Sequence, residues 1–216
     1  MSRGIFITLE GGEGAGKTTQ IRMLATALQQ QGYQVIVTRE PGGTPEAEKI
    51  RDFLVKRDGG NWTPMAECLL LFAARQMHVE HLIKPALADG KIVISDRFAD
   101  STRAYQSFGH GLPLDTIEEI NRLALGDFAP DLTFILDLPV PEGLARAGER
   151  LSAASSQEDR FERLGRDFHE RLRQGFLTIA RRDAERCRVI DATRGIEEIA
   201  RDMLSQVQLD AQRKLA

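Results

Sequence analysis

Residues 11–18 read Gly11-Gly12-Glu13-Gly14-Ala15-Gly16-Lys17-Thr18, and their spacing G-x-x-x-x-G-K-[ST] is typical of a phosphate-binding loop. The apolar run 5–9 before it predicts a buried strand, and residues 19–28 after it have apolar side chains at helical spacing. Glycines let backbone N–H groups approach phosphate oxygens, and the helix N-terminus adds a partial positive charge. A glycine-rich turn that only caps a helix is the alternative, and it leaves the strand before the loop unexplained.

Composition indicates one soluble domain over residues 1–216. The chain has 42% hydrophobic and 28% charged residues and a formal net charge of −3, which argues against a nucleic-acid-binding surface. Cys68 and Cys187 are far apart and form no metal-binding spacing, so we expect reduced thiols in a cytoplasmic protein. We expect neither a signal peptide nor a membrane span, and no membrane partner.

Strand and helix patterns alternate along the rest of the chain. We predict strands near residues 5–9, 34–38, 91–95, 131–137 and 188–191, and helices near residues 19–28, 47–54, 66–88, 102–108, 114–125, 161–183 and 196–209. This order predicts an α/β fold of three layers, with a five-stranded parallel sheet flanked by helices. The loops at the carboxyl ends of the strands then meet at one edge, where ligands bind in such sheets.

Two segments have a distinctive composition. Residues 68–74, Cys-Leu-Leu-Leu-Phe-Ala-Ala, are apolar on every side of the predicted helix, which favours a second apolar neighbour such as the partner in a homodimer. Residues 142–160 are polar and carry Arg146, Arg150 and Arg160, so we expect a mobile lid that excludes water from a transferring phosphoryl group. A solvated charged face is the alternative for the three arginines.

Charged residues follow the strands at the predicted edge. Lys17 is expected to reach the outer phosphates of a nucleotide, and Thr18 to bind Mg²⁺ with help from Asp96. Arg97 is suited to grip a second phosphate, although Asp96 and Arg97 could form a surface ion pair instead. Glu13 is unfavourable beside phosphates unless it accepts a donor such as a sugar hydroxyl; a solvated loop side chain is its alternative.

The helix that contains Phe72 and Arg75 offers two interpretations. These residues are three positions apart and share a helical face, and the spacing alone favours a core Phe and a surface Arg. The sequence shows no nucleophile–base arrangement. Phosphoryl transfer needs none, because it depends on positioning and charge neutralisation, and a phosphate acceptor is mostly dianionic at neutral pH.

Several motifs together resemble the bacterial thymidylate kinase family along nearly the whole chain. They are Leu9-Glu10-Gly11 through Thr18-Thr19, Thr38-Arg39-Glu40-Pro41-Gly42-Gly43-Thr44, Leu71-Phe72-Ala73-Ala74-Arg75, Asp96-Arg97-Phe98, Ser101-Thr102, Ala104-Tyr105-Gln106, Gly126-Asp127-Phe128 and Pro130-Asp131-Leu132-Thr133. The resemblance implies a P-loop nucleoside monophosphate kinase that transfers the γ-phosphoryl group of ATP to dTMP, with Mg²⁺, to give dTDP for dTTP synthesis.

The resemblance also implies roles for individual residues. ATP would be bound by Gly11, Gly12, Glu13, Gly14, Ala15, Gly16, Lys17, Thr18 and Thr19. The dTMP site would comprise Glu13, Pro41, Arg51, Phe72, Arg75, Arg97, Ser101, Tyr105 and Gln106. Within it, Phe72 would stack on thymine, Arg75 would bind its O4 atom, Tyr105 would pack near the sugar C2′ and Glu13 would meet the 3′-hydroxyl. Lys17, Asp96, Arg97 and a lid arginine would act in catalysis.

A difference between members of the resembled family indicates where the catalytic arginine lies. Some family members carry a catalytic arginine in the phosphate loop, where this chain has Gly14, so the chain resembles the members that carry it in the lid. Arg150 is the first choice, with Arg146 and Arg160 as alternatives because residues 151–158 make a longer lid than is usual in the family.

Three other functions are alternatives to a kinase that acts on dTMP. A nucleoside monophosphate kinase of different base specificity would share the phosphate loop, the Asp96-Arg97 loop and the lid. A GTPase-like switch needs an Asn-Lys-x-Asp segment, which the sequence lacks. A nucleotide-binding protein without activity would not require Lys17, Thr18, Asp96 and Arg97 together.

Overall fold

The structure, a computed structural model, describes residues 4–56, 60–154, 160–161 and 163–215. Its five strands are β1 (Phe6–Gly11), β2 (Val35–Arg39), β3 (Ile92–Asp96), β4 (Leu132–Asp137) and β5 (Cys187–Asp191). They form one parallel sheet in the order β2-β3-β1-β4-β5. The predicted α/β fold with a five-stranded parallel sheet is confirmed.

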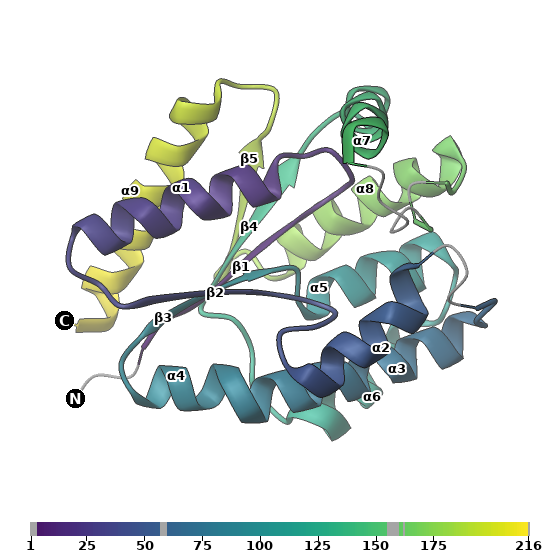
Figure 1. Cartoon of the computed structure of the whole chain (residues 1–216), viewed down its shortest axis with the longest axis horizontal. Coiled ribbons are helices and arrows are strands. Elements are labelled where there is room, and N and C mark those ends of the chain that lie inside the picture. Colours follow the sequence, from purple (N-terminus) through teal and green to yellow (C-terminus); the bar gives the residue numbers. More distant parts are fainter. Residues whose placement is uncertain (1–3, 57–59, 155–159, 162, 216) are drawn as a thin grey trace.

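Helices cover both faces of this sheet (Figure 1). The α-helices are α1 (Lys17–Gln30), α2 (Pro45–Val55), α3 (Pro64–His78), α4 (Lys84–Ala88), α5 (Ala99–Thr102), α6 (Leu114–Leu125), α7 (Val140–Ala154), α8 (Arg166–Arg182) and α9 (Ile196–Leu215), and two π-helical segments are η1 (Val79–Ile83) and η2 (Arg103–Gly109). No helix among the described residues is long and apolar enough to span a membrane.

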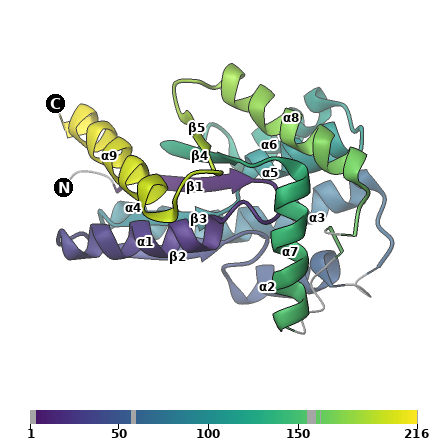
Figure 2. The same cartoon turned by 90° about the horizontal axis from the view of Figure 1, so that it is seen from above.

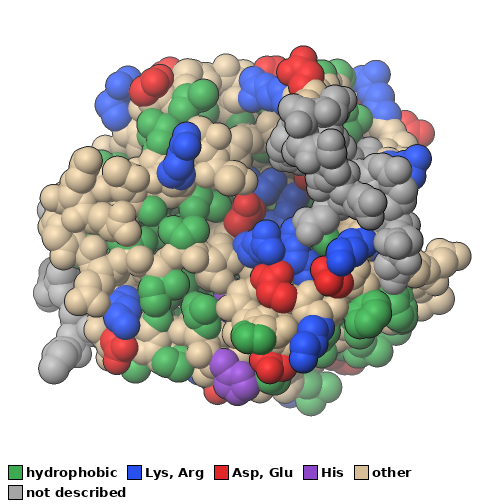
Figure 3. All heavy atoms as spheres, viewed as in Figure 1, with side chains coloured by type: hydrophobic (Ala, Val, Ile, Leu, Met, Phe, Trp, Pro, Cys, Tyr) green, Lys and Arg blue, Asp and Glu red, His purple; other side chains and the backbone are tan. Residues whose placement is uncertain are grey.

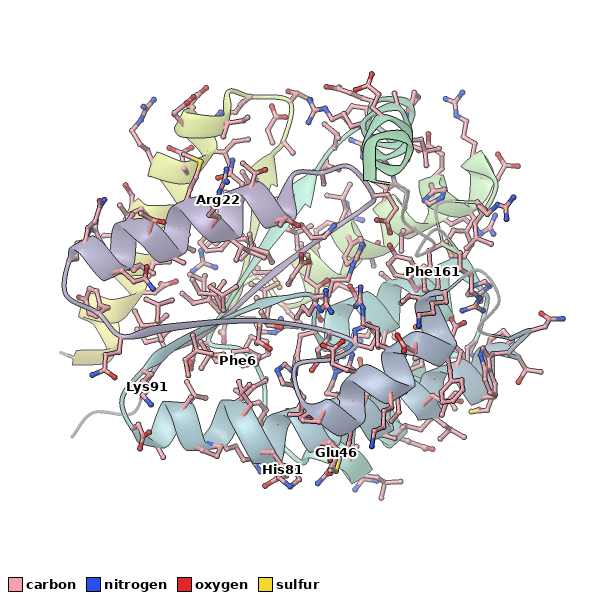
Figure 4. The ribbon with its side chains drawn as sticks, viewed as in Figure 1. Phe6, Arg22, Glu46, His81, Lys91 and Phe161 are labelled. Atoms are coloured by element: carbon pink, nitrogen blue, oxygen red, sulfur yellow. The ribbon has the colours of Figure 1, made fainter. Side chains whose placement is uncertain are left out.

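Alternation along β1 divides the core into two layers. Ile7 and Leu9 point to one face, where α1 and α9 supply apolar side chains such as Leu24 and Met203. Phe6 points to the opposite face and packs against η1 and α4 (Figure 4). All six residues of β1 are buried, because helices cover both faces of the sheet and β1 has a neighbouring strand on either side.

The termini of several elements differ from the prediction. The helix predicted over 66–88 is a continuous rod of α3, η1 and α4, with a π-helical turn in its middle. Much of the segment predicted as helix over 102–108 belongs to η2, and the helix predicted from 161 begins at Arg166. Periodicity detects the apolar face of a helix, but it does not distinguish a π turn from an α turn.

The segment predicted as a mobile lid is largely helical. α7 covers Val140–Ala154 and crosses the sheet edge beside the phosphate loop, as Figure 2 shows. α7 is amphipathic, because Val140, Gly143 and Ala147 are buried at helical spacing. The polar residues between them made this pattern difficult to recognise in the sequence. Residues 155–159 of the predicted lid lie outside the described residues.

Candidate active site

A pocket of about 730 Å³ lies at the carboxyl edge of the sheet. Figure 3 shows Lys and Arg side chains gathered in the hollow on this face, with acidic side chains beside them. The structure brings most of the predicted site residues to the pocket wall: Glu13, Gly14, Ala15, Gly16, Lys17, Thr18, Thr19, Pro41, Arg51, Arg75, Asp96, Arg97, Ser101, Tyr105 and Gln106. Segments far apart in the sequence therefore meet at the predicted edge.

The phosphate loop is shaped around Lys17. Its Nζ atom donates hydrogen bonds to the carbonyl oxygens of Gly11, at 3.1 Å, and Gly12, at 2.9 Å. Gly16, with φ of 89°, lets the chain turn directly into α1. Gly11 and Gly12 themselves line a small adjoining pocket instead of the main one, so their contribution here is to hold Lys17.

Burial changes the acid–base behaviour of Lys17. The side chain is 8% exposed. Burial, reinforced by the positive charge of Arg97, lowers the pKa of Lys17 to about 8 against the opposing effect of Glu13. A bound polyphosphate would supply the negative charge that keeps this ammonium group protonated.

Thr18 and Asp96 offer oxygen ligands at the start of α1. The Thr18 hydroxyl donates to Asp96 Oδ2 across 3.4 Å, which joins the phosphate loop to the end of β3. A hydroxyl and a carboxylate fit the hard-oxygen preference of Mg²⁺, which in nucleotide sites also takes phosphate oxygens and water. The described residues contain no cluster of three or more His, Cys, Asp or Glu side chains that could hold a metal without nucleotide.

Arg97 links three parts of the site. Its backbone is left-handed, with φ of 68°, which turns the guanidinium group toward the phosphate loop. Nη1 donates to the Gly11 carbonyl at 3.1 Å and to Ser101 Oγ at 3.0 Å, and Nη2 donates to Glu13 Oε1 at 3.0 Å. The partly buried arginine is therefore held in place before any phosphate arrives.

Glu13 is a carboxylate held by cations. Burial raises its pKa, but the charges of Arg97 and Lys17 and a hydrogen bond from Tyr105 outweigh this and lower the pKa to about 2. The Tyr105 hydroxyl donates to the same oxygen, Oε1, as Arg97. Glu13 thus stays ionised at neutral pH and does not act as an acid there.

The far end of the pocket is built around the buried Arg75. Its Nε donates to Glu40 Oε2 at 2.7 Å, and its Nη2 donates to the Phe98 carbonyl at 3.2 Å and to Thr102 Oγ1 at 2.9 Å. Nη1 is buried and has no hydrogen-bond partner within the described part of the chain. This nitrogen is therefore a candidate donor to a ligand in the pocket that Arg75 lines.

A buried chain of polar groups stands behind Arg75. The other oxygen of Glu40 lies 3.0 Å from His78 Nδ1, and His78 Nε2 lies 2.7 Å from Thr38 Oγ1. These three residues come from the end of β2, the loop after it and α3. They explain why a guanidinium that is 2% exposed is tolerated at this position.

Gln106 has a hydrogen-bond acceptor that complements the donor on Arg75. Its Nε2 donates to Glu67 Oε1 at 2.6 Å, whereas its buried Oε1 has no partner among the residues that the structure describes. An ionised carboxylate only accepts hydrogen bonds, so Glu67 fixes which end of the amide turns to it. Among the described residues, Arg75 and Gln106 thus provide an unpaired donor and an unpaired acceptor on two side chains that line the same pocket.

The structure does not bring Phe72 to the pocket wall. Phe72 is 2% exposed and packs in a cluster with Cys68 and Ile117, whereas its neighbour Leu71 lines the pocket. Leu71 is four positions before Arg75, a spacing that places both on one face of α3, while α6 covers the face of Phe72. Phe72 is therefore not among the residues that line the pocket in this structure, and its stacking on thymine stays a prediction.

The three lid arginines are in different situations. Arg146 lines the pocket and its Nη2 lies 2.5 Å from Glu142. Arg160 makes an ion pair of 2.5 Å with Glu67. The side chain of Arg150, our first choice, lies outside the described residues.

α7 meets the phosphate loop through two glycines. A Cβ atom on Gly14, whose φ is 69°, would lie 2.1 Å from the Gly143 carbonyl oxygen, and a Cβ atom on Gly143 would lie 2.5 Å from the Glu13 carbonyl oxygen. Backbone atoms on both sides leave no room for a side chain at position 14 while α7 stays in this place. This geometry explains why the loop carries no arginine there.

Three buried carboxylates at the site were not identified from the sequence as functional candidates: Glu10, Glu40 and Glu67. Glu10 accepts the backbone N–H groups of Phe98 and Ser101, at 2.8 and 3.3 Å, and burial, together with Asp100, raises its pKa to about 7. An acidic residue inside an otherwise apolar stretch, as with Glu10 at the end of β1, is the signal that could have found such groups.

This combination defines a class of protein. A phosphate loop opens α1, a second cationic centre, Arg97, lies beside it, and a polar cluster around the buried Arg75 lies in the wall of the same pocket. The class is that of P-loop kinases acting on small phosphorylated substrates.

Comparison with known proteins identifies the family. The family model for thymidylate kinase matches residues 9–203. A thymidylate kinase of Caulobacter vibrioides is 53% identical over 199 residues, covering 92% of this chain and 93% of the relative, and one of Geobacter sulfurreducens is 50% identical over 198 residues, covering 91% and 93%. The crystal structure of thymidylate kinase from Ehrlichia chaffeensis has a TM-score of 0.75 at 35% identity, covering 95% of this chain and 99% of that one. The chain belongs to the thymidylate kinase family.

The lowered pKa of Lys17 predicts proton uptake when nucleotide binds. With a pKa of about 8, roughly half of the Lys17 side chains are neutral at pH 8, and the negative charge of Mg-ATP should restore their protonation. We expect uptake of about half a proton per ATP at pH 8 and about a tenth at pH 7. Calorimetry at each pH in two buffers of different ionisation enthalpy measures this, and equal uptake at both pH values would contradict the Lys17 assignment.

The glycine contact predicts an effect of Gly143→Ala on catalysis. The new methyl group would meet the Glu13 carbonyl oxygen and push α7 away from the phosphate loop. We expect kcat to fall by about 10- to 100-fold with the KM for dTMP nearly unchanged, because small displacements of a catalytic group are costly. Gly148→Ala in the same helix is the control, since a Cβ atom there meets nothing within 4 Å. Equal activity of the two variants would show that the contact does not matter.

Proposed function

We propose that this chain carries out the reaction of its family, transfer of the γ-phosphoryl group of ATP to dTMP, with both substrates bound in the pocket at the sheet edge. Family membership supports the activity. The observation that carries the choice of dTMP is the pair of unused polar atoms on Arg75 and Gln106. Cytidine and purine monophosphates are the alternatives that this pair distinguishes.

The hydrogen-bond pattern of thymine matches these atoms. Thymine presents a carbonyl acceptor, O4, beside an N3–H donor, and the pocket offers the Arg75 Nη1 donor and the Gln106 Oε1 acceptor. Cytosine presents an amino donor and a ring-nitrogen acceptor at the same two positions. Both contacts would then be mismatched, which leaves buried polar groups unpaired at a cost of about 1–3 kcal/mol each. The pocket geometry therefore supports thymine over cytosine.

The phosphates occupy the other end of the pocket in this proposal. Residues 11–19 bind the ATP phosphates, with Lys17 on the outer ones, and Thr18 and Asp96 hold Mg²⁺, which neutralises charge as it develops. Arg97 and Arg51 bind the dTMP phosphate; Arg51 is anchored by a hydrogen bond of 2.9 Å from Nη1 to the Pro41 carbonyl. The acceptor is already an anionic phosphate, so no general base is needed.

Three residues would surround the sugar and base. Glu13 accepts a hydrogen bond from the 3′-hydroxyl, which adds a polar contact to a carboxylate already paired with Arg97 and Tyr105. Tyr105 packs near C2′, and Ser101, whose hydroxyl contacts Arg97, lies along the base edge. Leu71 supplies the apolar wall.

Arg146 is the lid arginine that the described residues support. It lines the pocket from α7, three positions after the glycine that contacts the phosphate loop. Its partner Glu142 is half-exposed, so the guanidinium is available to move to a phosphoryl group. Residues 142–154 of α7 would then act as the lid of a single kinase domain.

A panel of nucleoside monophosphates tests the proposal. We expect ATP consumption with Mg²⁺ to be fastest with dTMP, slower with dUMP and weak with dCMP, dGMP, AMP and UMP. Preferential turnover of dCMP or of a purine nucleotide would keep the phosphate site and overturn the roles of Arg75 and Gln106. Absence of turnover with every nucleotide would overturn the proposed reaction.

We also propose a homodimer through α3, in the cytoplasm. The outward face of α3 exposes Leu69, at 52%, and Met65, at 37%, although neighbouring residues are buried. The cytoplasmic location is supported by two free cysteines that are buried, because burial raises the pKa of Cys68 to about 11 and of Cys187 to about 12 and keeps both thiols unreactive.

The dimer predicts a change in mass for Leu69→Glu. Sedimentation equilibrium should give twice the chain mass of 24.1 kDa for the natural protein and the chain mass for the variant. A charge at the centre of an apolar interface is the reason for dissociation. Leu209→Glu, an equally exposed leucine on α9, is the control and should stay dimeric. A natural protein with the mass of one chain would refute the dimer.

A further inference from the structure

Glu67 is a buried carboxylate with two partners of different kinds. It lies in the first turn of α3, and its side chain is 2% exposed. One oxygen accepts from the amide of Gln106 at 2.6 Å, and the other lies 2.5 Å from Arg160 Nη1. None of the roles proposed above for substrate binding or phosphoryl transfer uses Glu67 or Arg160.

Arg160 is fixed at more than one point. Besides Glu67, its Nη1 donates to the Leu54 carbonyl at the end of α2, at 2.9 Å. Its guanidinium also lies over the ring of Phe161, 5.1 Å from the ring centre, and Phe161 lines the pocket from the segment between α7 and α8 (Figure 4). Arg160 thus connects α2, α3 and the wall of the pocket, and it is not directed at the phosphate end.

The orientation of an amide depends on its partner. A glutamine amide can turn over and exchange its donor and acceptor with little change of shape. In this pocket Glu67 prevents the exchange, because an ionised carboxylate accepts the Nε2–H and cannot donate to Oε1. Arg160 pairs with the other oxygen of Glu67 and supplies the cation that a buried carboxylate requires.

We propose that Glu67 and Arg160 are positioning residues that set base specificity, by holding Gln106 with its carbonyl oxygen toward the base. The pair makes no contact with the substrate in this mechanism. It selects an N3–H donor over a ring-nitrogen acceptor through the direction of the Gln106 amide. The inference rests on the proposed function, because it assigns a cause to the preference for dTMP.

The sharpest probe is 5-methyl-dCMP, which keeps the methyl group of dTMP and changes only the hydrogen-bonding edge of the base. We expect the natural protein to prefer dTMP strongly by kcat/KM. In Glu67→Gln, a neutral amide at position 67 can donate as well as accept, so Gln106 can turn over and receive the cytosine edge. In Arg160→Met, the carboxylate loses the cation that holds it.

The expected result is a fall of at least tenfold in the ratio of kcat/KM for dTMP to that for 5-methyl-dCMP in both variants. The KM for ATP should stay within about twofold, because the phosphate loop is untouched. Arg160→Lys should restore part of the ratio. A loss of structure alone would lower the activity with both nucleotides and leave their ratio unchanged.

Arg166→Met is the matched control. Arg166 lies at the start of α8, its side chain is 67% exposed, and it approaches Glu170 only to 3.8 Å. The ratio of kcat/KM for dTMP to that for 5-methyl-dCMP in Arg166→Met should equal the ratio in the natural protein. If circular dichroism shows that a single variant does not fold, the ratio is measured in the double variant Glu67→Gln, Arg160→Met instead. This variant removes both charges and leaves no buried charge unpaired.

The outcomes separate this inference from the proposed function. A natural protein that does not phosphorylate dTMP would overturn the proposed function. A natural protein that prefers dTMP, with folded variants of unchanged ratio, would overturn the role of Glu67 and Arg160 and leave the proposed function standing. A reduced ratio confined to the Glu67 and Arg160 variants supports the inference.

Discussion

The need of a buried carboxylate for a partner shapes this active site. Glu13, Glu40 and Glu67 are each largely buried, and each is paired with an arginine from a segment distant in the sequence. Leaving any of them unpaired would cost several kcal/mol, so folding is favoured only when the phosphate loop, the loops after β2 and β3, and α3 come together. The ion pairs that the buried carboxylates require for folding also position the guanidinium and amide groups of the pocket.

These pairs divide the pocket into two functions. At the phosphate end, the pocket wall carries four cationic side chains and two carboxylates, so an excess of positive charge remains for nucleotide phosphates: Lys17, Arg51, Arg97 and Arg146 against Glu13 and Asp96. At the base end, Arg75 and Glu40 neutralise each other, and the recognition that remains is by hydrogen bonds from atoms without a partner in the described residues. In the proposed function, charged groups therefore bind the phosphates that every nucleotide shares, and uncharged hydrogen-bonding groups distinguish the bases.

Much of this arrangement could be predicted from local patterns. The loop at 11–18 and the alternation of strands and helices were sufficient for the parallel sheet and for the edge at which Asp96 and Arg97 meet Lys17. The family resemblance, and not the local spacing, predicted that Arg75 and Gln106 belong to one site, and both line the same pocket.

What the sequence could not predict depends on contacts that no local pattern contains. The neighbours Leu71 and Phe72 are both apolar, and only the packing of α6 against α3 decides which one faces the pocket. The helical part of the lid was missed because its apolar positions are small, at Gly143 and Ala147. The carboxylates Glu40 and Glu67 look like surface charges until their partners, 35 and 93 positions away, are seen.

The most direct test of this account is a crystal structure with dTMP bound. We expect thymine O4 to lie within about 3.2 Å of Arg75 Nη1 and N3 to lie within about 3.2 Å of Gln106 Oε1. Gln106 Nε2 should still donate its hydrogen bond to Glu67. A base bound elsewhere in the pocket, or a Gln106 amide turned to present Nε2 to the base, would contradict the claim that buried carboxylates orient the groups that recognise thymine.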